Sequence, residues 1–429
     1  MKNQFVVTEA GEGLRVCSYE TDRFKTGILS VNLVLPLRGN IAEKALLPSL
    51  LCASCREYPD LLSLNRKLAE LYGAELSPSV AKHGENLVLR LSMTQIGDRF
   101  SLDGESISVE CAELLCKALF EPNVTDGAFD AEEVEREKRI MLDRLEAQKN
   151  NKRAYALKQM IGLMCEEEAY SLSALGTEED IAALTPEQLY RSWQELLQTA
   201  FVQLQVVGDL QTDAITSLFR SYFDKVEGRN VVRGETVVIP EAADLKRGEE
   251  EQDVEQSKLV LGFRCGMTYP FENYAAVRTF VDLFGGGTYS RLFMNVREKQ
   301  SLCYYCSARL MGGKGIITVQ SGVETANAEV AETEILRQLF EMQEGGVTQE
   351  DLDKSHKSME DYFLSVFDTP EELDGWFYSQ AADETFQTPE ELVAELKAVT
   401  VEDVVAAARA ASLDTVFLLK GTGTNGEEN

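Results

Sequence analysis

Apolar residues along the chain follow two spacings, and each spacing recurs in both halves. Short runs such as ENLVLRLSMT and GIITVQSGV partly alternate apolar with polar residues, which predicts strands of a sheet with one covered face. The predicted strands span residues 28–37, 77–82, 86–95, 257–264, 302–310 and 315–323. Helical spacing predicts longer elements over residues 105–119, 129–166, 325–342 and 348–366. Strands that come first and helices that gather on one face of the sheet define the α+β class.

A repeat relates the two halves. Residues 185–210 predict a capped helix followed by a buried strand, and residues 400–424 repeat that plan. Thr185 corresponds to Thr400 at an offset of 215, and nearby matches at slightly different offsets indicate loop insertions between equivalent units. The repeat predicts two α+β domains, each an antiparallel-rich sheet with helices packed on one face.

The stretch between the two copies is predicted to be a linker. Its run from Gly248 to Asp253 is too charged to bury, which favours a solvated connection over a functional acidic arm. A short strand is predicted at 235–239, and the last residues are expected to fray. The predicted boundaries are 1–224 for the first domain, 225–256 for the acidic linker, 257–423 for the second domain and 424–429 for the tail.

Charge narrows the classes of partner. The 429 residues include 42 Lys and Arg against 72 Asp and Glu, a formal charge of −30, so nucleic acid and anionic membranes are not expected as partners. The chain has no run of 18 apolar residues, and its first residues lack the basic end and apolar core of a signal peptide. We therefore expect a cytoplasmic protein.

The nine cysteines are expected to be reduced thiols, because their number is odd and their spacing shows no regular framework. Two CxxC pairs occur, Cys52/Cys55 and Cys303/Cys306. They lie too far apart in sequence for the two knuckles of a zinc ribbon. Both pairs are predicted to be buried, inert thiols rather than a structural metal site.

The segment FGGGTYSRLFMNVREKQSLCYY, residues 284–305, carries the strongest motif. Three glycines end one helix, and Thr288 or Ser290 can cap the next. The segment resembles the signature of the C-terminal half of the M16 metallopeptidase family, which includes insulinase, pitrilysin and the mitochondrial processing peptidase. That signature is a glycine-rich turn, a Ser-Arg-Leu-Phe helix, then Arg-Glu-Lys, and a Tyr seven residues after the Arg. The matching residues are Ser290-Arg291-Leu292-Phe293, Arg297-Glu298-Lys299 and Tyr304.

The resemblance covers essentially the whole chain and implies two LuxS/metallohydrolase-like domains. In active members the Arg/Tyr pair approaches the zinc site of a facing half, holds the substrate and assists the scissile carbonyl. A guanidinium and a phenol can both donate hydrogen bonds to developing charge on a carbonyl oxygen. The resemblance assigns these roles to Arg297 and Tyr304. The alternative is that Arg297 pairs with a carboxylate and Tyr304 is an ordinary sheet residue.

The zinc motif of active members is missing. They carry HxxEH on the first helix, in which two His bind zinc and the Glu activates water. Here the aligned positions are Leu47, Leu50 and Leu51, and the stretch Lys44–Arg56 contains neither His nor Glu. Glu135 falls at the position of the third ligand by resemblance, but a lone carboxylate does not hold zinc usefully. We expect Glu135 to be a surface charge paired with Lys138 three residues later.

The two histidines of the chain, His83 and His356, are both predicted to lie on the surface. Neither belongs to HxxEH or its inverted form, and a serine or cysteine triad would lack a plausible base. We therefore expect that the chain catalyses no reaction by itself.

These observations leave three hypotheses. The first is a non-catalytic M16 subunit that pairs with an HxxEH-bearing chain. The HxxEH-bearing chain binds the zinc, and this chain supplies Arg297 and Tyr304 to the peptide substrate in trans. A homodimer is the other possible assembly. The second is a structural or binding protein of the same fold with no role in proteolysis. The third is a self-contained peptidase with an unusual metal site. The acidic charge would favour basic peptides if it lined an enclosed chamber.

Overall fold

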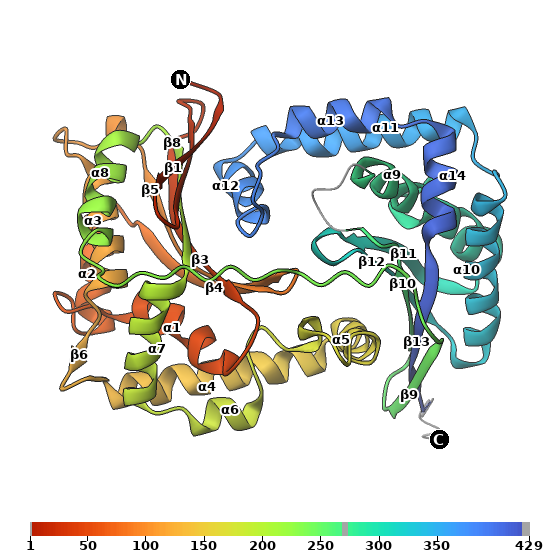
Figure 1. The fold of residues 1–429 in the computed structure, drawn as a ribbon, viewed down its shortest axis with the longest axis horizontal. Coiled ribbons are helices and arrows are strands. Elements are labelled where there is room, and N and C mark those ends of the chain that lie inside the picture. Colours follow the sequence, from red (N-terminus) through yellow and green to blue (C-terminus); the bar gives the residue numbers. More distant parts are fainter. Residues whose placement is uncertain (1, 268–272, 423–429) are drawn as a thin grey trace, which may run out of the picture. The chain divides into compact units, whose positions relative to one another are not determined.

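The computed structural model describes residues 2–267 and 273–422. Their packing separates two compact units (Figure 1). Unit 1 consists of Met1–Leu145, Leu172–Glu235 and Ser365–Phe386, and unit 2 of Glu146–Ser171, Thr236–Leu364 and Gln387–Asn429. Each unit combines one large mixed sheet with packed helices, which confirms the predicted α+β class.

The sheet of unit 1 has six strands in the order β1-β2-β8-β3-β5-β4. All neighbours are antiparallel except β2 and β8, which run parallel. The strands are β1 (Phe5–Gly11), β2 (Leu14–Glu20), β3 (Thr26–Pro36), β4 (Glu75–His83), β5 (Asn86–Ile96) and β8 (Phe201–Gly208). Sequence patterning predicted β3, β4, β5 and β8 but missed the β1–β2 hairpin at the start.

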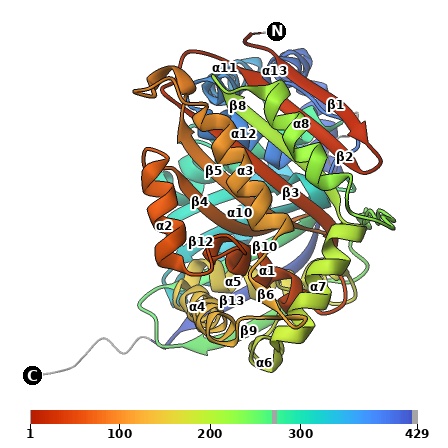
Figure 2. The ribbon, with the colours of Figure 1, turned by 90° about the vertical axis from the view of Figure 1, so that its left-hand side faces the viewer.

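A helical layer covers one face of this sheet, as Figure 2 shows for α3 and α8. Alternate strand residues, among them Val31, Leu33 and Leu204, meet this layer in one apolar core. The helices of unit 1 are α1 (Ile41–Ala53), α2 (Leu61–Glu70), α3 (Ile107–Phe120), most of α4 (Ala131–Asn150), α6 (Glu178–Ala183), α7 (Pro186–Thr199), α8 (Thr212–Phe223) and α12 (Pro370–Ser379).

The sheet of unit 2 has five strands in the order β11-β12-β10-β13-β9, with β13 and β9 parallel. The strands are β9 (Lys246–Gln252), β10 (Ser257–Arg264), β11 (Cys303–Met311), β12 (Ile316–Val323) and β13 (Ser412–Gly421). The helices are α5 (Lys152–Met164), α9 (Tyr274–Gly285), a π-type helix η3 (Leu292–Lys299), α10 (Ala328–Gln343), α11 (Gln349–Leu364), α13 (Pro389–Ala398) and α14 (Val401–Ala410).

Each unit also contains a helix from the other half of the sequence. Leu373 and Phe377 of α12 pack on the second face of the unit 1 sheet, against residues such as Val207. Met160 of α5 packs against Phe417 in unit 2. The units defined by packing therefore cut across the two sequence repeats. Within the described residues, no helix is long and apolar enough to cross a membrane.

A buried ion pair holds α12 on the sheet of unit 1. Arg90 of β5 pairs with Asp374 of α12, whose side chain is almost fully buried. The hydroxyl of Ser30 in β3 donates to the other carboxylate oxygen at 2.9 Å. Burial raises the pKa of Asp374, against the opposing effect of Arg90.

An equivalent buried network holds the segment after α5 in unit 2. Arg264 of β10 donates to both carboxylate oxygens of Glu168, at 2.6 and 3.2 Å. Its Nε donates to Asp414 at 2.9 Å, and Lys314 lies 2.6 Å from Glu168. All four side chains are buried and have lost their hydration. The ion pairs within the network compensate for that loss.

Three other predicted segments differ from the structure. The predicted helix 129–166 is two helices, separated at Asn151, whose side chain accepts from the backbone N–H of Ala154 at 3.1 Å. The acidic run predicted as solvated linker forms the edge strand β9, in which exposed and half-buried residues alternate. Residues 235–239, predicted as a strand, are not in one. The predicted tail lies outside the described residues.

Candidate functional site

Helix α1 carries the three leucines at the degenerate zinc positions. Asn40 caps it by accepting from the backbone N–H of Glu43 at 3.4 Å. Leu47, Leu50 and Leu51 are fully buried and belong to the apolar core of unit 1. The positions that the resemblance aligns with the zinc motif are therefore packed with hydrocarbon.

Helix α4 faces α1 through two carboxylates that the sequence analysis did not single out. Glu133 accepts from the hydroxyl of Ser54, just after α1, at 2.7 Å, and burial raises the pKa of Glu133. Glu137, one turn later, is close enough to Cys52 of α1 to raise the pKa of that thiol, after the larger effect of burial.

Glu135 lies on the other side of α4. Its side chain is 66% exposed and accepts from Lys138 at 2.7 Å, which is the ion pair predicted from sequence. Helical spacing could have indicated this orientation. Buried Val134, Met141 and Leu145 mark the inner face of α4, so Glu135 points outward.

The residues present at α1 do not fit zinc, because Leu47, Leu50 and Leu51 have no ligand atoms. Among residues 2–267 and 273–422, no group of three or more His, Cys, Asp or Glu side chains is arranged to hold a metal ion.

The glycine turn and helix η3 position Arg297 in unit 2. A Cβ on Gly285 would lie 2.4 Å from the backbone nitrogen of Ala308, so only glycine lets the end of α9 approach β11 this closely. Of the two predicted caps, Ser290 takes the role, since its hydroxyl accepts from the N–H of Phe293 at 3.4 Å. Helix η3 buries Leu292 and Val296 and ends where Ser301, at φ 52°, donates to the Arg297 carbonyl.

The Arg297 side chain is 38% exposed. Its guanidinium carbon lies 4.6 Å from the centre of the Phe293 ring, and its Nε lies 3.6 Å from a carboxylate oxygen of Glu298. Arg291, by contrast, donates to the Gly346 carbonyl and lies 3.6 Å from Asp351, so it ties this segment to the start of α11.

A β-bulge presents Tyr304. Cys303 pairs with Val323 and Tyr305 pairs with Gly322. Tyr304 is therefore an extra residue without a register partner on β12. Its side chain is 73% exposed. The next residue, Tyr305, turns inward, and its ring lies under the guanidinium of Arg153 at 4.4 Å. The two neighbouring tyrosines therefore differ in environment: Tyr304 is exposed and Tyr305 is packed against Arg153.

Histidine 83 is more buried than predicted. It lies at the end of β4 with its ring centre 4.8 Å from that of Tyr378. Its buried Nδ1 has no hydrogen-bond partner among the described residues, and burial lowers the pKa of His83 to about 4. His356 is half-buried on α11, and burial lowers its pKa too.

We expect His83 to make unit 1 sensitive to mild acid. Between pH 6.5 and 4 the unfolded chain protonates this imidazole while the folded chain keeps it neutral, so stability falls as the pH falls through this window. His83→Phe should remove about 2 kcal/mol of the loss between pH 7 and 4.5. Urea unfolding followed by tryptophan fluorescence measures the stability of unit 1 at each pH, because Trp193 and Trp376 both lie in unit 1. His356→Gln serves as the control, and an unchanged pH slope in His83→Phe would contradict the prediction.

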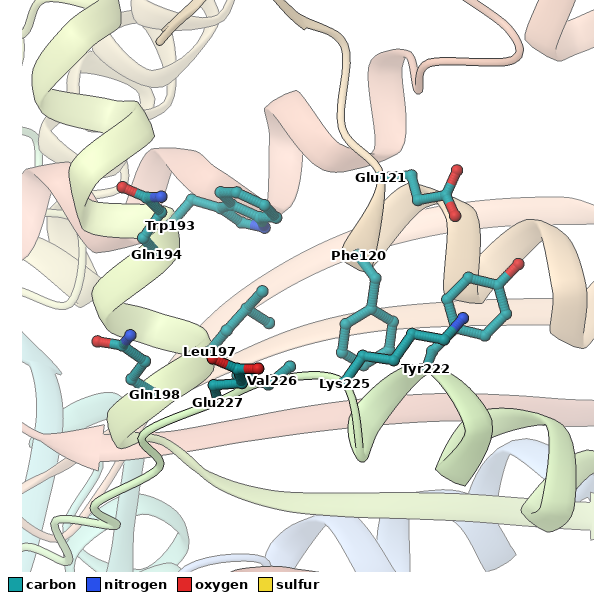
Figure 3. Close-up of a pocket in the computed structure, with 10 residues that line it drawn as sticks. All are labelled: Phe120, Glu121, Trp193, Gln194, Leu197, Gln198, Tyr222, Lys225, Val226 and Glu227. Atoms are coloured by element: carbon teal, nitrogen blue, oxygen red, sulfur yellow. The ribbon is translucent and has the colours of Figure 1, made fainter.

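A pocket of about 410 Å³ opens in the helical layer of unit 1 (Figure 3). The indole of Trp193 forms one wall and donates to the Leu119 carbonyl at 2.8 Å. Lys225 lies over the ring of Tyr222 at 4.7 Å. The pocket is distinct from the predicted site residues; its lining is Phe120, Glu121, Trp193, Gln194, Leu197, Gln198, Tyr222, Lys225, Val226 and Glu227.

Comparison with known proteins agrees with this geometry. Residues 183–359 match the family described as "Peptidase M16 inactive domain". The chain is 33% identical over 411 residues to "Probable inactive metalloprotease YmfF" of Bacillus subtilis, covering 96% of each chain. A crystal structure of a conserved protein from Enterococcus faecalis has a TM-score of 0.88 at 26% identity, covering 98% of this chain and all of that one. The peptidase M16 inactive domain from Pseudomonas fluorescens shares the fold, with a TM-score of 0.79 at 18% identity and 98% coverage of both chains.

The fold and the leucine-filled site together define a homologue of an inactive metallopeptidase. The chain belongs to the M16 peptidase family. The family resemblance drawn from the motif at 284–305 is therefore confirmed.

Proposed function

We propose that this chain is a catalytically inactive M16 subunit that pairs with an HxxEH-bearing chain and supplies Arg297 and Tyr304 to peptide substrate at that chain's zinc site. In this proposal zinc belongs to the other subunit, the assembly is a cytoplasmic heterodimer, and neither nucleic acid nor membrane is a partner. A homodimer that binds peptide without cleaving it is the alternative assembly.

The observation that carries the proposal is the pair of local irregularities around the motif. A π-type helix holds Arg297, and a β-bulge holds Tyr304, within eight residues of each other. Both irregularities are uncommon and cluster at functional sites, because they sacrifice regular hydrogen bonding to aim particular side chains. A tyrosine that served only the sheet would not need the extra residue that turns it to solvent.

The second candidate is a structural or binding protein with no role in proteolysis. It is favoured by the contacts that Arg297 already makes with Phe293 and Glu298, which give the guanidinium a local packing role.

Substitution of either motif residue should lower peptidase activity of the mixed chains. With an HxxEH-bearing M16 chain from the same genome, Arg297→Ala and Tyr304→Phe should each reduce kcat by about 10²-fold, because each removes a donor to the charged carbonyl oxygen. Peptide hydrolysis by the mixture, and by each chain alone, is the measurement.

Two matched variants control for nonspecific effects. Arg309→Ala removes an exposed arginine of β11, and Tyr362→Phe removes the hydroxyl of another exposed tyrosine of unit 2. Both should leave activity of the mixture unchanged. If Arg297→Ala and Tyr304→Phe also left the peptidase activity of the mixture unchanged, that result would support the structural role instead.

A further inference from the structure

The bulge at Tyr304 puts Cys303 and Cys306 on the same face of β11. In a regular strand, residues three apart point to opposite faces. Here Cys303 pairs with Val323 and Cys306 with Ser321, and those two partners are two residues apart on β12. Because residues two apart share a face, the extra residue puts both cysteines on the same face. The two thiols are close enough for each to shift the pKa of the other.

The two thiols differ in exposure and surroundings. Cys303 is partly exposed, whereas Cys306 is buried. The interaction with the Cys306 thiol lowers the pKa of Cys303, and the Ser321 hydroxyl and the Arg297 charge lower it further against the effect of burial. The interaction with Cys303, together with burial, raises the pKa of Cys306.

The other seven cysteines are buried and have raised pKa values, chiefly because of burial. Burial raises the pKa of Cys111, Cys116 and Cys165 to about 12 and that of Cys265 to about 11. The second CxxC pair, Cys52 and Cys55, shares this inert character. Cys303 therefore differs from every other cysteine in both exposure and chemistry.

We propose that Cys303 and Cys306 form a thiol–disulfide exchange site, in which Cys303 is the attacking thiol, Cys306 is the resolving thiol, and the substrate is a low-molecular-weight disulfide of the glutathione type. This inference is independent of the proposed function. Of the pair expected to be buried, Cys306 is buried and Cys303 is partly exposed. An accessible attacking thiol beside a protected second thiol is the arrangement that such exchange requires.

The exchange consists of two displacements. The Cys303 thiolate attacks one sulfur of the small disulfide, the sulfur–sulfur bond breaks, and one small thiolate leaves. Cys306 then gives up its proton and attacks the Cys303 sulfur of the mixed disulfide, which releases the second small thiolate. The protein dithiol is oxidised by two electrons, the small disulfide is reduced to two thiols, and those thiols take up the two protons.

The test uses the intact chain in buffers with a range of ratios of reduced to oxidised glutathione. After acid quenching and alkylation, peptide mass mapping should find a Cys303–Cys306 disulfide that forms and is reversed with the ratio, while Cys52–Cys55 stays reduced. Brief iodoacetamide treatment of the reduced chain at pH 7 should modify Cys303 at least about tenfold faster than any other cysteine. In Cys306→Ala, the mixed disulfide at Cys303 should accumulate, because the resolving thiol is absent.

Two results would overturn the proposal. One is wild-type protein that shows no Cys303–Cys306 disulfide at any ratio or carries only the mixed disulfide. The other is alkylation of Cys303 no faster than that of Cys55. Both rest on the wild-type chain, so they hold even where Cys306→Ala does not fold.

Discussion

Glu168→Ala should destabilise unit 2 by about 3–5 kcal/mol. The substitution removes the carboxylate that Lys314 and Arg264 share and leaves Asp414 as the carboxylate paired with Arg264. Both cations are almost fully buried. Burial opposes ionisation of Glu168, but hydrogen bonds from Arg264 and Lys314 lower its pKa overall. The stabilisation is therefore present above the unfolded pKa and is lost as the pH falls through the folded pKa.

Urea unfolding followed by circular dichroism measures this loss. Both tryptophans lie in unit 1, so tryptophan fluorescence reports that unit separately. Glu167→Ala is the matched control, because Glu167 is exposed one residue earlier. A midpoint for Glu168→Ala that equals the midpoint for Glu167→Ala would show that the buried network does not hold this segment.

Leu50→Glu should destabilise unit 1 by at least about 4 kcal/mol. The substitution restores the general base of the zinc motif at its aligned position, but that position is 1% exposed within an apolar core. The variant loses the stabilisation from a buried leucine side chain and places a carboxylate among hydrocarbon side chains. An active site that had merely lost its metal would accept this glutamate at little cost.

The tryptophan-monitored unfolding midpoint tests the expected loss. Leu50→Met keeps the volume and the apolar character and should cost less than about 1.5 kcal/mol. Leu62→Glu makes the same change at an exposed leucine of the same unit and should be nearly neutral. If Leu50→Glu matched Leu62→Glu, water would have access to position 50, which would contradict its burial in the core.

The repeated strands and helices could be predicted from sequence because their apolar spacing is local information. The match at Thr185 and Thr400 holds in the structure, where both residues form capping boxes at the start of α7 and α14. The placement of α5 and α12 could not be predicted in this way. Which sheet a helix covers depends on contacts between distant segments, such as Arg90 with Asp374, and no local spacing encodes them.

The acidic strand β9 shows a second limit. Its run of glutamates is typical of a solvated linker, yet an edge strand buries only one side of its backbone and leaves alternate side chains in water. Lys420 of β13 lies 3.3 Å from Glu249 and 3.1 Å from Glu251 on this strand. Charge alone excluded burial, but it did not exclude strand pairing.

The candidate site was only partly predictable for the same reason. The motif made Arg297 and Tyr304 candidates, and the missing ligands pointed to Leu47, Leu50 and Leu51, because a comparison of residue types at aligned positions needs no structure. The pairing of Cys303 with Cys306 depends on the bulge between them, and an unbroken alternation predicts the opposite geometry. Their CxxC spacing directly beside the motif was the one signal available.

The most direct test of a catalytically inactive chain is its zinc content beside its own peptidase activity. The purified chain, equilibrated with zinc and freed of excess by gel filtration, should retain less than about 0.1 zinc per chain and hydrolyse no peptide, because a site packed with leucines offers no ligand atoms. An HxxEH-bearing homologue treated in parallel should retain about one zinc per chain. One tightly held zinc in this chain, together with hydrolysis that a chelator abolishes, would contradict the account and establish a self-contained peptidase with a different metal site.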